Sequence, residues 1–464
     1  MTAASGLPRI LTIMGSGETT PTMARTHKAI LDRLGDKPVP AVLLDTPYGF
    51  QENAQDISDR AVEYFLTTVG AAFNLASFRS VDVDPLTRQT AFVRIREARY
   101  FFTGPGSPTY ALRVWANTEI PRLLASKLET GGAVTMASAA ALTLGRLTVP
   151  VYEIYKVGDA PRWFDGLDLL TPLGLPVAVV PHYDNAEGGN HDTRFCYLGE
   201  RRLRMLEADM PKDVFILGVD GHTALVLDLD AGSATVTGLG TVTVRKDGRS
   251  TVFPAGSQIP IEDLAAAARE AGAARVVSLA PSRDGSGPTA AEALIEASSS
   301  RTLREEVADL ERIFEASLDG CDVPAAVRAI LSLEETIQAW AGDTEQSDAL
   351  AVARSALRSA VVCLGELAVD GTRDTADLIR PFVDGLLAER ERSRAAREWA
   401  AADAIRDRLL AAGIELHDTP EGTTWSLPQG DTTPAAREAR NEPEAPAAPD
   451  AVATEAPTAE APTR

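Results

Sequence analysis

Short apolar runs alternate with amphipathic segments from about residue 8 to residue 255. The apolar runs are "RILTIMG", "PAVLLDTPYG", "LASFRSVDV", "ARYFFTG", "GGAVTMAS", "PVAVVPHY", "DVFILGV" and "TALVLDL". Between the second and third runs, Ile57, Val62, Phe65 and Leu66 recur at helical spacing. This alternation predicts an α/β domain with a mostly parallel sheet that is flanked by helices on both faces.

The pattern then changes twice. The stretch "SATVTGLGTVTVRKDGRSTVFPAG" alternates at period two around Gly turns, which predicts a small antiparallel edge that closes a domain at residues 1–255. Residues 256–300 are predicted to be a linker with one Ala-rich helix, and residues 301–428 an all-α helical domain. Residues 429–464 are rich in Pro, Ala, Glu and Thr, and we expect a disordered tail there.

The overall charge limits the classes of partner. A formal net charge of −21 argues against a general affinity for nucleic acid or an anionic membrane, although a local basic face remains compatible with it. No apolar stretch approaches the roughly 20 residues that span a bilayer, and no charged leader precedes an apolar run at the N-terminus. The three cysteines are far apart and have no CxxC spacing, which indicates a reducing compartment. We therefore expect a cytoplasmic protein without a membrane partner.

The most chemically suggestive stretch is "GGAVTMASAAALTLGR", residues 131–146. A strand that delivers Ser138 directly into a helix would raise the hydroxyl above the sheet edge, beside the N–H groups of the helix N-terminus. The usual G-x-S-x-G signature is degraded, because Met136 and Ala140 stand where glycines would. From this stretch alone, Ser138 is either a nucleophile or a small residue that permits tight packing.

A nucleophilic serine needs a base and a group that orients the base. His182 is the histidine at the carboxyl end of a predicted strand, where open α/β sheets bind ligands. Glu153 is an available carboxylate. The competing residues, none with a comparable position, are His27, His191, His222 and His417 among the histidines and Asp159, Asp165 and Asp184 among the acids.

Several stretches, in their joint order, resemble the dipeptidase E and cyanophycinase family of serine peptidases. They are "TIMGSGE", "YFFTGPGSPTYAL", "AVTMASAAAL", "VVPHYDN", "NHDTRFCYLGERRL" and "ILGVDGHTALVL". The resemblance covers about the first 255 residues and implies a class I glutamine amidotransferase-like α/β fold. It also implies hydrolysis of a small peptide or isopeptide, with an aspartyl residue, without a metal or another cofactor.

Each site residue takes its role from that resemblance. Ser138 would be the nucleophile, His182 the general base and then acid, and Glu153 the group that holds the imidazole. The remaining roles are oxyanion N–H donors at Gly106 and Ala139 and a substrate contact at Arg194. A surface ion pair is the other interpretation of Arg194.

Three departures from the family pattern leave a second interpretation open. Ala140 replaces a glycine and would crowd the turn unless its φ stays negative. Met136 replaces a small residue and would narrow the pocket. Two prolines in "GPGSPT" remove N–H groups from the loop that supplies an oxyanion donor. The alternative is a family member that binds a ligand without hydrolysing it.

The helical region carries a second resemblance. Residues 314–340 and 386–428 resemble the C-terminal region of cysteinyl-tRNA synthetase, with one long helix expected to pack through Trp399, Ala402, Ile405 and Leu409 and to stop at Gly413. No HIGH-like or KMSKS-like segment is present, so a ligase is not predicted. The resemblance implies contact with tRNA or a translation-related protein. Acidic residues interleave with the arginine cluster of this region, formed by Arg390, Arg392, Arg394 and Arg397, and weaken its field. The oligomeric state stays open.

Overall fold

The computed structural model describes residues 6–186, 191–269, 275–276, 301–343, 348–371, 375–419 and 422–427. The chain divides into two compact units, residues 1–361 and residues 362–464. This division differs from the predicted domain boundaries, because residues 301–361 belong to the same unit as the α/β domain. The predicted linker at 256–300 is described at residues 256–269, which contain the helix α8 (Ile261–Arg269), and at residues 275–276. The rest of the linker and the predicted tail at 429–464 lie outside the described residues.

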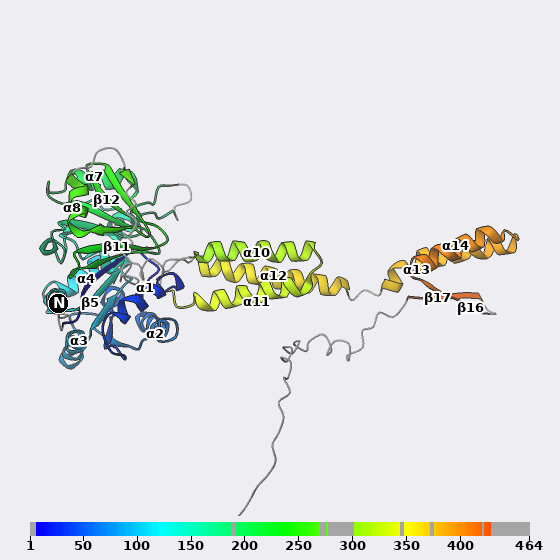
Figure 1. The fold of residues 1–464 in the computed structure, drawn as a ribbon, viewed down its shortest axis with the longest axis horizontal. Coiled ribbons are helices and arrows are strands. Elements are labelled where there is room, and N and C mark those ends of the chain that lie inside the picture. Colours follow the sequence, from blue (N-terminus) through cyan, green and yellow to red (C-terminus); the bar gives the residue numbers. More distant parts are fainter. Residues whose placement is uncertain are drawn as a thin grey trace, which may run out of the picture. The chain divides into compact units, whose positions relative to one another are not determined.

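The first unit contains an eight-stranded mixed sheet (Figure 1). Its order is β14 (Gln258–Pro260), β11 (Ser233–Gly238), β10 (Thr223–Asp228), β1 (Arg9–Met14), β5 (Gly132–Ala137), β4 (Tyr100–Thr103), β2 (Ala41–Leu44) and β3 (Phe73–Ala76). The neighbours β1, β5, β4, β2 and β3 pair in parallel. Strands β10, β11 and β14 pair antiparallel at the other side of the sheet. The parallel part brings the carboxyl ends of β1, β4 and β5 to one edge, where a site is expected.

A second sheet of seven strands belongs to the same unit. Its order is β15 (Arg275–Val276), β13 (Arg249–Pro254), β12 (Thr241–Lys246), β9 (Phe215–Val219), β8 (Val177–Val180), β6 (Leu147–Thr148) and β7 (Phe164–Asp165). The sequence pattern did not indicate that the strands divide between two sheets. The antiparallel pairing of the period-two stretch is confirmed, but β11 lies in the first sheet while β12 and β13 lie in the second. A sequence pattern gives strand periodicity and does not tell which neighbour a strand pairs with.

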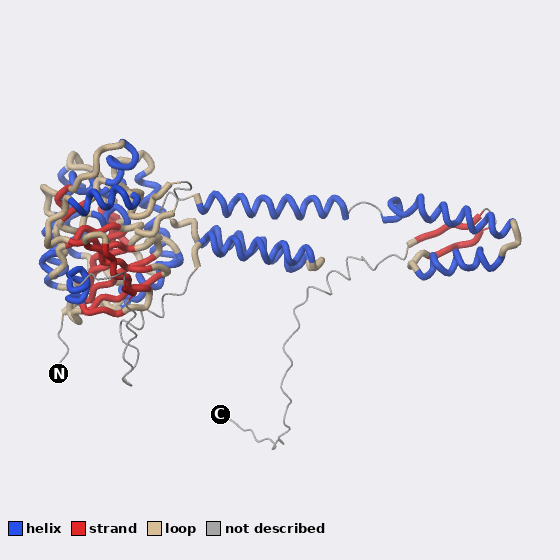
Figure 2. Tube along the Cα trace, turned by 90° about the horizontal axis from the view of Figure 1, so that it is seen from above, coloured by secondary structure: helices blue, strands red, loops and turns tan. Residues whose placement is uncertain are grey.

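Helices enclose the strands, which lie in the interior of the α/β region (Figure 2). Because side chains alternate along a strand, β1 sends Ile10 to one core and Leu11 to another. The first core includes side chains of α1 (Pro21–Asp32) and α2 (Ala54–Tyr64). The second includes side chains of α3 (Pro85–Glu97), α4 (Pro108–Trp115) and α5 (Ile120–Thr130), together with strands β8 and β9. The flanking helices of the predicted α/β fold are thus confirmed.

Three further helices complete the first unit: α10 (Leu303–Asp319), α11 (Val323–Ala339) and the first part of α12 (Ala349–Gly371). A capping box starts α10, because the Thr302 hydroxyl accepts from the Glu305 N–H while the Glu305 carboxylate accepts from the Thr302 N–H. Leu303, Leu333 and Trp340 form part of the core between these helices. None of the helices in the described part of the chain is both long and apolar enough to cross a membrane.

The second unit contains α13 (Thr375–Ala395), α14 (Trp399–Ala411) and a hairpin of β16 (Glu415–Thr419) and β17 (Gly422–Ser426). The prediction of one continuous helix was wrong, because Arg397 adopts a left-handed φ of +63° and the Glu398 N–H turns back to the Ser393 carbonyl. The predicted hairpin is confirmed. Trp399, expected to pack, is 59% exposed at the start of α14, while Ala402 and Leu409 are buried.

Candidate active site

Ser138 stands at a sharp junction between a strand and a helix. β5 ends at Ala137, and α6 (Ser138–Leu142) begins at the serine itself. Its φ of +48° is a left-handed conformation that a serine rarely adopts, and such strain persists where the surrounding packing holds it. Ala139 and Ala140 are buried beside it, and the Ala140 N–H donates to the Gly104 carbonyl. The predicted strand-to-helix turn is therefore present, with the hydroxyl at its apex.

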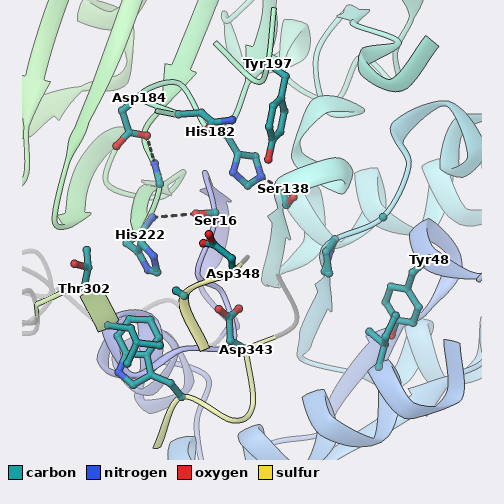
Figure 3. Close-up of a pocket in the computed structure, with 18 of the residues that line it drawn as sticks. Ser16, Tyr48, Ser138, His182, Asp184, Tyr197, His222, Thr302, Asp343 and Asp348 are labelled. Atoms are coloured by element: carbon teal, nitrogen blue, oxygen red, sulfur yellow. Dashed lines mark hydrogen bonds between the residues drawn. The ribbon is translucent and has the colours of Figure 1, made fainter. Parts of the chain in front are cut away.

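His182 lies opposite the serine. It follows β8 closely, and its φ of +47° is also left-handed. The Ser138 Oγ lies 2.9 Å from the His182 Nε2. Both side chains line one cavity of about 450 Å³, and Figure 3 shows the imidazole pointing at the serine. Two residues 44 positions apart in the chain thus lie within hydrogen-bond distance, as a nucleophile and its general base would need to.

Two N–H groups predicted as oxyanion donors lie near this pair in the fold. The Ala139 N–H is in the first turn of α6, where no intrahelical acceptor exists. Gly106 lines the cavity with φ +133°, and a Cβ there would lie 2.1 Å from the Pro47 carbonyl oxygen, so only glycine fits. Pro108 occupies the first turn of α4, where its missing N–H would have no helical acceptor anyway.

The two other departures from the family pattern are structurally harmless. Met136 is fully buried in the hydrophobic core and does not line the cavity, so the expectation that it narrows the pocket was wrong. The reason is alternation, because β5 directs Met136 and Ala137 to opposite faces. Ala140 is helical without a positive φ, and its methyl group is accommodated in the core.

Glu153, predicted to hold the imidazole, lies at the start of a π-helical turn at Glu153–Val157. Its Oε2 accepts a hydrogen bond from the Thr109 hydroxyl at 3.2 Å, and the residue lines a neighbouring cavity rather than the one that contains His182. Asp184 shares the cavity with His182, and its Oδ1 accepts from the Gly221 N–H. The orienting role of Glu153 stays a prediction, with Asp184 as its competitor.

Arg194 does not line the cavity that contains Ser138. Its guanidinium forms two hydrogen bonds of 2.9 Å with the Asp192 carboxylate and lies over the Phe195 ring. The bonds from Arg194 hold the pKa of Asp192 well below its usual range. The structure supports the surface ion pair, in which the Asp192 carboxylate accepts from the Nε and Nη2 of Arg194, and the substrate contact stays a prediction.

Residues after position 300 form part of the cavity wall, which the sequence did not indicate. Thr302, Arg304, Trp340, Asp343 and Asp348 line the same cavity as Ser138. Three of them, Thr302, Asp343 and Asp348, are labelled in Figure 3. This segment resembles a different protein family, and that resemblance did not predict that it would line the cavity of Ser138.

Buried ionisable groups surround this wall. His222 packs edge-on against Trp340 with ring centroids 5.6 Å apart, and burial lowers the pKa of His222. Burial and the nearby Asp184 raise the pKa of Asp220 to about 6, while its carboxylate accepts two hydrogen bonds from Thr241. Of these two groups, His222 lines the cavity, whereas Asp220 does not.

The geometry defines an α/β protein with a serine–histidine pair in a cavity that helical residues help to close. No group of three or more potential metal-ligating side chains gathers anywhere in the described ranges. The distance between the Ser138 Oγ and the His182 Nε2 is of the kind that nucleophilic acyl transfer requires.

Comparisons with known proteins identify two distinct regions. Residues 378–425 match the anticodon-binding domain of cysteinyl-tRNA ligase. The chain is 36% identical over 121 residues to a cysteine–tRNA ligase of Caulobacter vibrioides and 40% identical over 124 residues to one of Nocardioides sp.. These matches cover 25% and 24% of this chain and 26% and 25% of the ligases. The chain therefore spans about a quarter of the length of the curated relatives that it matches.

Two solved structures of peptidases are similar in fold. One is a peptidase from an acI-B1 actinobacterium, with a TM-score of 0.45 and 21% identity over 55% of this chain and 97% of that one. The other is a putative peptidase E protein from Listeria monocytogenes, with a TM-score of 0.32 and 12% identity over 47% of this chain and 94% of that one. The match of residues 378–425 agrees with the second resemblance, to cysteinyl-tRNA synthetase.

Proposed function

We propose that this protein is a serine hydrolase that cleaves a small peptide or isopeptide through an acyl-enzyme on Ser138. The single observation that carries the proposal is the 2.9 Å distance between the Ser138 Oγ and the His182 Nε2 inside one cavity. A serine that only served packing would not need a left-handed φ of +48° and an imidazole within hydrogen-bond distance.

Acylation follows from this geometry. The Ser138 Oγ attacks the scissile carbonyl carbon while the His182 Nε2 takes the hydroxyl proton. The negative charge that develops on the carbonyl oxygen is stabilised by the N–H groups of Ala139 and Gly106 at the helix N-terminus and the glycine loop. His182 then gives its proton to the leaving amine. Removal of one such N–H donor typically costs about 3 kcal/mol of transition-state stabilisation.

Deacylation uses the same groups in reverse. A water molecule loses a proton to His182 and attacks the acyl carbon, and the Ser138 Oγ leaves as the free hydroxyl. The overall reaction consumes one water and releases an acid and an amine. A carboxylate that orients the imidazole would be Glu153 or Asp184, and the variants Glu153→Gln and Asp184→Asn separate them by their effect on the pH profile of kcat.

The test is hydrolysis of a panel of aspartyl, β-aspartyl and neutral dipeptides, read by mass spectrometry. Ser138→Ala removes the nucleophile, and Ser126→Ala, on helix α5, is the matched control. We expect cleavage by the wild type and by Ser126→Ala, with the aspartyl peptides cleaved fastest, and none by Ser138→Ala. Equal cleavage by Ser138→Ala would exclude the proposal.

A second function, tRNA binding by residues 362–464, is favoured by the match to the anticodon-binding domain. Arg390 is buried and pairs with Asp418, so the cations that remain for phosphates are on the surface. Arg406 and Arg408 are exposed on α14 and form no ion pair with any residue that the structure describes. A gel shift with bulk tRNA should weaken with salt and in the variant Arg406→Gln/Arg408→Gln; no shift at low salt would contradict tRNA binding.

A further inference from the structure

A second cavity, of about 570 Å³, lies next to the one that contains Ser138. Gln51, Tyr152 and Lys156 line both cavities, so the two spaces are adjacent. The lining of the second cavity is rich in aromatic rings and cations, and the hydrolytic mechanism uses none of them. A dipeptide bound at Ser138 would leave these groups without a ligand.

Two aromatic rings of the lining lie side by side, with their planes tilted by 52°. Phe50 and Tyr110 have ring centroids 5.1 Å apart, and Phe50 is 51% exposed although it is a large apolar side chain. Exposed rings that line a cavity suit stacking of a nucleobase, because every base presents a π-face. Tyr152 adds a third ring at the border with the Ser138 cavity.

The cations lie beside these rings. The Arg113 guanidinium carbon is 5.0 Å from the Tyr110 ring centroid, and the Lys156 Nζ is 4.8 Å from the Tyr152 ring centroid. Neither cation has an ion pair with any residue in the described ranges of the chain. With Glu153 as the other charged residue of the lining, the cavity carries two positive charges and one negative charge, whereas the whole chain carries −21. A locally positive, aromatic cavity in an acidic protein suits an anionic aromatic ligand such as a nucleotide.

Glu153 and Thr109 restrict how such a ligand would lie. The carboxylate would repel a phosphate placed against it, so the phosphate belongs near Arg113 and the base or ribose near Glu153. A carboxylate accepts hydrogen bonds from exocyclic amines and from ribose hydroxyls. The Thr109 hydroxyl already donates to the Glu153 carboxylate and holds it at the cavity wall.

We propose that the second cavity binds the 3′-terminal adenosine of an aminoacyl-tRNA and presents the aminoacyl ester to Ser138. This inference rests on the proposed hydrolase function and on the match of residues 378–425 to an anticodon-binding domain. The Ser138 Oγ attacks the ester carbonyl, His182 protonates the departing ribose oxygen, and water hydrolyses the acyl-enzyme. The products are a free amino acid and a tRNA with a free terminal hydroxyl, and no reactant other than water is needed.

The test compares three esters of one amino acid with the full-length protein: the aminoacyl-tRNA, 3′-O-aminoacyl-adenosine 5′-monophosphate and the ethyl ester. We expect the two nucleotide esters to be hydrolysed with kcat/KM at least about tenfold above the ethyl ester, since loss of one stacked base or phosphate contact lowers affinity by roughly tenfold. A tRNA ester that exceeds the small ester identifies tRNA as the source of the nucleotide. Equal rates identify a small aminoacyl nucleotide and overturn the tRNA part of the proposal.

The variants Arg113→Gln and Phe50→Ala, at two exposed residues of the second cavity, should raise KM for the nucleotide esters about tenfold and leave kcat and ethyl-ester hydrolysis unchanged. Arg122→Gln, on the surface of α5 and paired with Glu119, is the matched control. Ser138-dependent dipeptide cleavage without any preference for nucleotide esters would overturn the nucleotide site and leave the hydrolase standing.

Hydrolysis of no substrate would defeat the proposed function, and calorimetry with adenosine 5′-monophosphate then decides the site by itself. Binding that Arg113→Gln abolishes would support a nucleotide site, whereas no binding would overturn it.

Discussion

The two compact units differ in which polar residues they hold at strained or buried positions. The first unit holds Ser138 and His182 in left-handed backbone conformations and buries His27 completely. In the described part of the second unit, Arg390 is buried and its partner Asp418 is 48% exposed, and Arg397 has a left-handed φ at the break between α13 and α14. Strained and buried polar groups are costly and cluster at functional sites. The contrast agrees with the proposal that the first unit carries the hydrolysis.

The difference also concerns how each unit is stabilised. The first unit has two extensive cores, one on each face of the eight-stranded sheet, and further core clusters beside them. The described core of the second unit is small and includes Val383, Leu387, Leu409 and Ile414. A unit with a large core tolerates strain at its active site, whereas a small unit depends on each of its few contacts.

The largest expected effect concerns the proposed catalysis by the first unit. His182→Ala removes the base that lies 2.9 Å from the Ser138 Oγ, and kcat for the best dipeptide should fall about 10,000-fold. Binding of tRNA by the second unit should be unchanged. Steady-state kinetics and a gel shift on the same preparation measure both; a loss of less than about tenfold in kcat would contradict the role of His182.

A second prediction concerns the buried His27. Its Nδ1 lies 2.6 Å from the Tyr100 hydroxyl and its Nε2 lies 2.8 Å from the Glu18 carbonyl, which fits a neutral ring that donates from Nε2. Burial lowers the pKa of His27 to about 4, from 6.5. The pKa of His27 is lower in the folded state than in the unfolded state. Its contribution to the free energy of unfolding is therefore full above pH 6.5 and falls by about 3 kcal/mol as the pH decreases towards 4.

Urea unfolding of the wild type and of His27→Gln at several pH values measures this loss. The stability advantage of the wild type over the variant should shrink between pH 6.5 and pH 4, because glutamine does not titrate. A constant difference across that range would contradict a neutral buried histidine and weaken the contrast between the units.

A smaller effect is expected in the second unit. Arg390→Ala breaks hydrogen bonds to the Asp418 carboxylate and to the Thr423 hydroxyl, which join α13 to the hairpin. Residues 375–427 should lose about 2 kcal/mol of stability, the typical value for hydrogen bonds to charged groups. Hydrogen exchange should rise in β16 and β17 alone, and a similar rise in the first unit would show that the units are not independent.

The smallest effect is expected at Trp399. Because this side chain is 59% exposed, Trp399→Ser should change the free energy of unfolding by less than about 0.5 kcal/mol. Leu409→Ala, at a buried position of the same helix, should cost about 2 kcal/mol or more. Thermal unfolding measures both variants. An equal loss in the free energy of unfolding would show that Trp399 packs as the helical spacing predicted.

The sequence predicted the parts of the fold that depend on local pattern. Strand and helix periodicity located β5, α6 and β8, and hence the turn of Ser138 and the position of His182 at a strand end. The division of strands between two sheets was not predictable, because it depends on pairing between strands far apart in the chain. The sequence did not predict the break between α13 and α14 at Arg397. No Pro or Gly stands at this position, and the left-handed φ of Arg397 is visible only in the structure.

The sequence likewise predicted only part of the candidate site. Ser138 and His182 stood out because residue type and strand position coincided. The sequence left two interpretations of Arg194 open, because it does not show that the side chain faces Asp192, two residues away. The sequence did not predict that Trp340, Asp343 and Asp348 line the cavity of Ser138, because contacts between distant parts of the chain leave no periodic pattern.

The most direct test of the central claim is labelling with a fluorophosphonate, followed by peptide mapping with mass spectrometry. The reagent phosphonylates an activated serine Oγ and releases fluoride. The account predicts a single adduct on Ser138 in the wild type and a strongly reduced rate in His182→Ala. No adduct on Ser138, or labelling that is independent of His182, would show that the pair is structural and would contradict the account.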